Sequence, residues 1–130
     1  MGLPQAVPPE LSALTTKARL SSVVGWCRGE FRPGRSGAYA VAVSSAAGGR
    51  YLVLDADATV VALDSYTRRA DLSCYTPAQA RELHLAIGES DTIHGAITPR
   101  WGTTVVCAFV DDTTAVCWQY SPAEQAFVRV

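Results

Sequence analysis

Apolar and β-branched residues recur in short runs along the chain, and glycine, proline or aspartate separates one run from the next. Four such runs cover residues 21–31, 38–43, 50–54 and 59–63. Short alternating runs between turn-forming residues are typical of strands, and close spacing favours antiparallel pairing. We therefore predict a strand in each run, with the last three forming a meander. One face of the second run consists of alanines, which would allow close packing against a neighbour.

A second strand pattern lies near the C-terminus. Residues 103–110 are mainly β-branched and apolar, the acidic segment Asp111-Asp112-Thr113 interrupts them, and residues 114–120 resume the pattern. This arrangement predicts a β-hairpin. If the turn centres on Asp112, Cys107 and Cys117 face each other across the hairpin at a separation that suits a disulfide. A last strand is expected at residues 127–130.

Helical signals occur in two places. Apolar residues repeat at helical spacing between Pro9 and Leu20, and proline suits the first turn of a helix. Thr76 to Gln79 form a capping box with proline at the first helical position, and Gly88 ends the pattern. The expected fold is α+β, namely an antiparallel sheet (the meander plus the C-terminal hairpin) with one or two packed helices. Residues 1–9 would be a flexible, proline-rich lead-in, and residues 10–130 a single domain.

Composition narrows the class of protein. The chain has 130 residues, 48% of them hydrophobic, and a net charge of -1. This excludes disorder and gives no charge-driven reason to bind nucleic acid, and no apolar run is long enough to span a membrane. Lys17 is the only lysine beside ten arginines, and asparagine is absent. That bias indicates a bacterial gene rich in G and C.

The cysteines bear on the compartment. There are four, and none is in a Cys-x-x-Cys motif. The facing pair Cys107 and Cys117 leaves Cys27 and Cys74 to pair with each other, and each bridge would contribute about 3–4 kcal/mol in the chain-entropy model. Disulfides indicate an exported protein, periplasmic or secreted, although the N-terminus shows no signal peptide. The alternative is a cytosolic protein with free, buried cysteines.

Candidate chemistry is sparse. Ser90, Asp91 and His94 gather a hydroxyl, a carboxylate and an imidazole in one irregular segment, which would suit a small hydrolase, although a capping or turn role is favoured. Asp55 and Asp57 lie where a hairpin must reverse, so a turn is favoured over a cation site. Histidine spacing indicates no metal site, and no cofactor is expected.

Arginine and aromatic residues occur together in two predicted connections. Arg68 and Arg69 lie in one, and Arg100 and Trp101 in the other. Arginine and tryptophan are the residue types that dominate protein interfaces. We therefore expect these residues to bind another protein, although Trp101 suits a core equally well.

The sequence favours a non-enzymatic, exported bacterial binding protein, such as an inhibitor or an immunity-like partner of another protein. Two alternatives remain, the small hydrolase and a structural or accessory component of the cell envelope. A structural component of the envelope would be compatible with a homo-oligomer.

The disulfide assignment makes the first prediction. Protein purified from its native source and unfolded without reductant should show no thiol reactive towards a chromogenic thiol reagent, because all the cysteines are paired. The same material unfolded after reduction provides the positive control. Four reactive thiols before reduction would contradict the assignment and the exported location with it.

Overall fold

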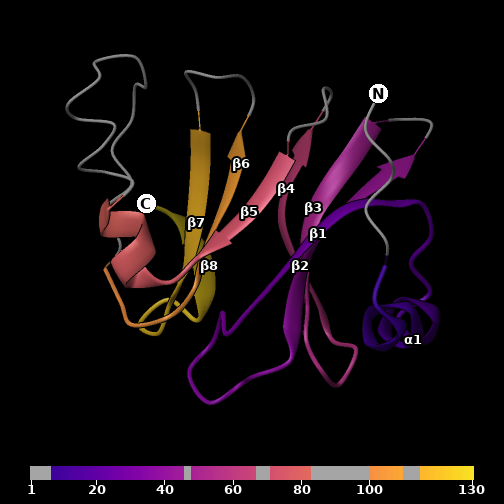
Figure 1. Ribbon diagram of the computed structural model, residues 1–130, viewed down its shortest axis with the longest axis horizontal. Coiled ribbons are helices and arrows are strands. Elements are labelled where there is room, and N and C mark those ends of the chain that lie inside the picture. The colour runs from indigo at the N-terminus through magenta and orange to yellow at the C-terminus, as the bar shows by residue number, and fades with distance from the viewer. Residues whose placement is uncertain (1–6, 46–47, 67–70, 83–99, 110–114) are drawn as a thin grey trace.

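The chain forms two antiparallel four-stranded sheets, shown in Figure 1. The computed structural model describes residues 7–45, 48–66, 71–82, 100–109 and 115–130. The first sheet has the order β1-β2-β3-β4 and the second the order β5-β6-β7-β8. Their bounds are β1 Val23–Gly29, β2 Ala38–Ser45, β3 Gly48–Leu54, β4 Val60–Tyr66, β5 Asp71–Tyr75, β6 Val105–Phe109, β7 Ala115–Ser121 and β8 Ala126–Arg129. The helix α1 spans Pro9–Lys17, and residues 77–82 are also helical.

The predicted meander and C-terminal hairpin are confirmed, and so is a helix beginning at Pro9. The arrangement is mostly β, with two sheets where the sequence predicted one. The difference lies in β5, Asp71–Tyr75, which was not predicted. This short strand pairs with β6, about 30 residues further along the chain. A local pattern of five residues does not reveal so distant a partner.

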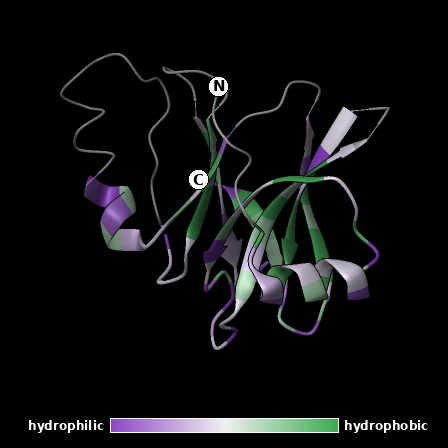
Figure 2. Ribbon diagram, turned by 45° about the vertical axis from the view of Figure 1, so that its right-hand side comes forward, coloured by the Kyte–Doolittle hydropathy of each residue, from purple (hydrophilic) through white to green (hydrophobic). Residues whose placement is uncertain are grey.

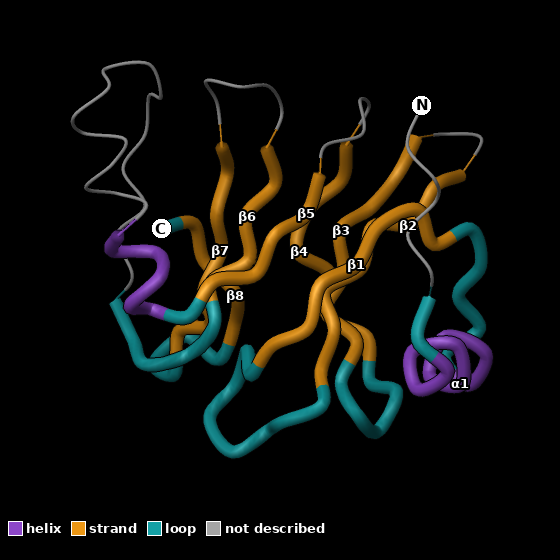
Figure 3. Tube along the Cα trace, viewed as in Figure 1, coloured by secondary structure: helices purple, strands orange, loops and turns teal. Residues whose placement is uncertain are grey.

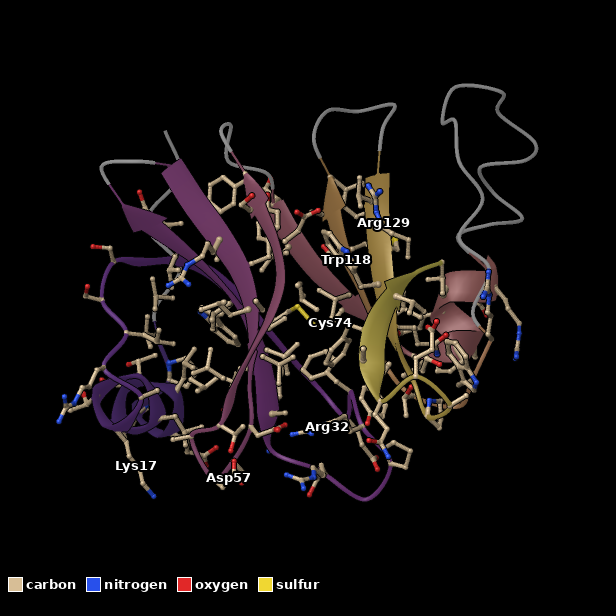
Figure 4. All side chains as sticks on the ribbon, turned by 180° about the vertical axis from the view of Figure 1, so that it is seen from behind. Lys17, Arg32, Asp57, Cys74, Trp118 and Arg129 are labelled. Carbon is tan, nitrogen blue, oxygen red and sulfur yellow. A yellow bond between two sulfur atoms is a disulfide. The ribbon has the colours of Figure 1, made fainter. Side chains whose placement is uncertain are left out.

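The two sheets pack face to face around a shared core. Ala38, Ala40 and Ala42 line the inner face of β2, as the sequence predicted for that strand. Bulkier side chains fill the remaining space, among them Tyr51 of β3 and Trp118 of β7, whose ring centroids lie 5.8 Å apart. Figure 4 shows Trp118 and Cys74 in the region between the sheets.

One helix lies on the outer side of each sheet, as the tube view in Figure 3 shows. The side of β2 that points away from the core carries Tyr39, Val41 and Val43, and α1 packs there through the fully buried Leu11. Figure 2 shows α1 lying across the hydrophobic strands of this sheet. The helical residues 77–82 place the buried Ala80 beside the outer face of the second sheet.

Both predicted disulfides are present. Cys107 and Cys117 are direct partners in the β6–β7 register and form one bridge. Cys27 of β1 and Cys74 of β5 form the other, which joins the first sheet to the second. The first bridge lies on the outer face of the second sheet, and the other lies against the core between the sheets.

The capping box is also confirmed. The Thr76 backbone N–H donates to Gln79 Oε1 at 2.9 Å, and the Gln79 N–H donates to Thr76 Oγ1 at 3.2 Å. These reciprocal bonds fix the start of the helix directly after β5.

A buried ion pair joins the β1–β2 connection to the β3–β4 turn. The Arg32 guanidinium contacts the Asp55 carboxylate, whose side chain is only 3% exposed. Arg32 also lies over the ring of Tyr120 at 5.9 Å, so it links both sheets. Asp57, in the same turn as Asp55, remains 59% exposed and accepts the Thr59 N–H at 3.0 Å. The turn role predicted for the two aspartates is confirmed, and only Asp55 forms a buried ion pair.

Substituting Asp55→Asn should lower the free energy of unfolding by about 3 kcal/mol, because it leaves the charge of Arg32 buried without a counterion. Urea denaturation measures the change. Asp57→Asn is the matched control, since the same chemical change at an exposed carboxylate keeps an oxygen for the Thr59 N–H, loses only a solvent-screened pair with Arg35 and should shift the midpoint far less. Equal midpoints for the two variants would show that the buried pair does not stabilise the fold.

Candidate functional site

Of the residues expected to bind a partner, the structure describes Arg100 and Trp101. Both precede β6, with Arg100 exposed and Trp101 half-buried. Arg68 and Arg69 lie outside the described residues. The candidate hydrolase residues Ser90, Asp91 and His94 lie outside them too.

The segment that carries Arg100 and Trp101 is held by one side chain, Gln119 of β7. Gln119 is fully buried, and its Oε1 accepts the backbone N–H groups of Arg100 at 2.8 Å and Trp101 at 3.3 Å. Its Nε2 donates to the carbonyl oxygens of Trp101 at 2.9 Å and Thr103 at 2.8 Å. All four hydrogen-bonding positions of the amide are therefore used within the protein. A segment without regular structure is thereby fixed on the second sheet.

The same segment also contacts the first sheet. The Glu30 backbone N–H donates to Thr104 Oγ1 at 3.0 Å, and the Thr104 N–H donates to the Glu30 carbonyl at 2.8 Å. Gly29, at the end of β1, permits this approach, since a Cβ there would lie 2.6 Å from a methyl carbon of Thr104. Residues 100–104 thus bridge the two sheets.

A shallow cleft of about 380 Å³ lies beside this bridge. Its walls come from the end of β1, from the start of the helix after β5 and from the bridging segment, through Arg28, Glu30, Gln79, Gly102 and Thr104, among others. These side chains offer a guanidinium, a carboxylate, an amide and a hydroxyl. Such a lining suits the polar groups and backbone of a protein partner.

The part of the chain that the structure describes was compared with the requirements of a metal site and of a membrane span. Within the described ranges, no group of three or more metal-binding side chains is close enough to hold an ion. In the same ranges, no helix is long and apolar enough to cross a membrane.

The sequence singled out Arg100 and Trp101, whose role in binding stays a prediction, and gave no reason to single out Gln119, Glu30 or Thr104. The sequence does mark Gln119 as unusual, because it is an amide side chain between two aromatic residues of a predicted strand, Trp118-Gln119-Tyr120. Its partners lie 16 to 19 residues away in the chain, so only the fold reveals them.

The chain was compared with protein families, curated proteins and solved structures. The chain matches no family model, no curated protein and no solved structure.

Gln119→Leu should free the bridging segment, because the backbone groups of residues 100–103 lose their partners. We expect a loss of about 2 kcal/mol in unfolding free energy and faster hydrogen exchange at the Arg100 and Trp101 amides, followed by NMR. Gln79→Leu is the control, since it removes a glutamine hydrogen bond elsewhere, the capping bond to the Thr76 N–H, and should leave exchange at the Arg100 and Trp101 amides unchanged. Unchanged exchange at Arg100 in Gln119→Leu would show that Gln119 does not hold the segment.

Proposed function

We propose that this protein is an exported bacterial binding protein without enzymatic activity. It recognises another protein through Arg100, Trp101 and the adjoining cleft, in the manner of an inhibitor or an immunity protein. The observation that supports this proposal best is the fixation of residues 100–103 by the buried Gln119.

Fixation of the segment bears directly on affinity. A flexible loop loses conformational entropy when it binds, whereas a segment already held by hydrogen bonds loses little. Burying a glutamine in a sheet is costly unless its amide is fully bonded, and here the amide bonds only to this segment. The fold thus commits a core position of β7 to holding Arg100 and Trp101 in place.

The residue types on the segment fit the same purpose. Arg100 is exposed, so its guanidinium is available to a carboxylate or a carbonyl of a partner. Trp101 is half-buried, so part of this residue is accessible to a partner. Tryptophan and arginine are enriched among the side chains that dominate the binding energy of protein interfaces, and here both extend from a backbone held by Gln119.

Two covalent bridges support an extracytoplasmic location. The cytoplasm keeps most cysteines reduced, whereas the periplasm and the medium allow disulfides to persist. Both bridges connect elements of the core, and no free cysteine occurs among the described residues.

The immobilised protein is first used to isolate a partner from the native envelope or the culture fluid. The partner is then purified, and its affinity for the wild-type protein and for variants is compared. Trp101→Ala and Arg100→Ala should each weaken its binding about 30-fold, as expected for residues at an interface centre. Isothermal titration calorimetry measures the affinity. Arg129→Ala, an exposed arginine on β8, is the control and should bind as the wild type does.

The melting temperature shows whether the variants remain folded. If both variants melt like the wild type and still bind with undiminished affinity, the assignment of this surface is wrong. Hydrolysis of the partner by the wild-type protein would instead support the alternative based on Ser90, Asp91 and His94.

A further inference from the structure

A second hollow lies at the opposite end of β1 from the cleft, where the α1–β1 connection meets the β2–β3 hairpin. Its volume is about 330 Å³, and its lining includes Arg19, Ser21, Ser44 and Arg50. The two arginines are the only charged side chains that line it in the described structure. We propose that this hollow binds a doubly charged tetrahedral oxyanion, of the phosphate monoester class.

Charge is the first argument. Within the described residues Arg19 and Arg50 take part in no salt bridge, whereas Arg32 and Arg35 are both paired with aspartates. The whole chain carries a net charge of -1. The described walls of this hollow therefore carry two arginines and no carboxylate.

The backbone at Arg19 supplies the second argument. The end of α1 is a complete Schellman motif, in which Leu20 N–H donates to the Thr15 carbonyl at 2.8 Å and Arg19 N–H donates to the Thr16 carbonyl at 3.2 Å. Arg19 occupies the left-handed position of this motif, with φ 58°. Glycine normally occupies that position, because a side chain there is strained. An arginine at this position is explained if its guanidinium binds a ligand.

The opposite wall is also fixed. Arg50 lies on β3, where it pairs with Val43 of β2 and Ser65 of β4 in the interior of the first sheet. The Tyr66 hydroxyl donates to the Val43 carbonyl at 2.9 Å, and the Tyr66 ring covers Gly49 beside Arg50. The Ser44 N–H donates to the Ser22 carbonyl at 3.0 Å, which ties the α1–β1 connection to β2. Both arginines therefore extend from immobilised backbone.

The geometry of guanidinium groups selects the ligand. One guanidinium offers two parallel donors, which satisfy the two oxygens of a carboxylate. Two guanidiniums and the Ser21 hydroxyl offer about five donors, more than the roughly four lone-pair positions of a carboxylate, whereas a phosphate group presents three or four oxygens. The size of the hollow leaves room for a small organic substituent on that phosphate. This site shares no residue with the Arg100–Trp101 surface and does not depend on the function proposed for it.

The experiment is a titration of the ¹⁵N-labelled protein with glycerol 2-phosphate at about 0.15 M salt, where nonspecific attraction is screened. Saturable shifts are expected at the amides of Ser21, Ser44 and Gly49. Inorganic phosphate should give the same pattern, and acetate at the same ionic strength should bind at least about tenfold more weakly. Comparable affinity for acetate would overturn the assignment of the ligand class.

Two variants test the residues. Arg50→Gln should weaken glycerol 2-phosphate binding by about tenfold. Arg19→Gly should weaken it similarly while leaving the melting temperature equal to or above that of the wild type, since glycine relieves the left-handed backbone. Arg129→Gln, an exposed arginine on the second sheet, is the control and should bind normally.

Two outcomes would overturn the site. One is the absence of saturable shifts around the hollow in the wild type. The other is equal affinity in Arg19→Gly, Arg50→Gln and Arg129→Gln, which would show diffuse attraction to arginines. A purely structural role for Arg19 predicts a lower melting temperature in Arg19→Gly with unchanged binding, and that result would also reject the proposal.

Discussion

The structure depends on the packing of two sheets against each other, in which small side chains on one inner face leave room for large side chains beside them. On one side β2 contributes only methyl groups to the inner face, from Ala38, Ala40 and Ala42. Because these side chains are short, the second sheet can approach closely, and Tyr51 and Trp118 fill the space beside them. The apolar area removed from water there is the main driving force for folding. The disulfide between β1 and β5 and the ion pair at Arg32 add to an arrangement that this packing already favours.

The connections follow from the same constraint. Once the sheets face each other, β1 and β5 become neighbouring edges, and the described segment that leads into β6 passes the end of β1. Residues 100–104 make this approach at Gly29, where a side chain would collide with Thr104. Gln119 then satisfies the backbone groups that such an irregular segment would leave without partners. The exposed Arg100 therefore extends from a backbone that a buried side chain holds in place.

Much of this could be predicted from residue patterns, and the omissions have physical causes. Strands β2 to β4 and the hairpin of β6 and β7 were readable because each pairs with its neighbour in sequence, and the facing cysteines followed from that register. The strand β5 and the division into two sheets were not, because they depend on pairing and packing between distant segments. For the candidate site, composition pointed to Arg100 and Trp101. The side chains that position them were not predictable, since a buried glutamine has a role only through its three-dimensional neighbours.

The bridge between Cys27 and Cys74 encloses β2, β3 and β4 in a covalent ring, because the two cysteines are 47 residues apart in the chain. A protease that cuts one peptide bond inside this ring produces two polypeptides that remain linked by sulfur, and the clipped molecule keeps its mass apart from one added water. Such a molecule is held together after a first cleavage.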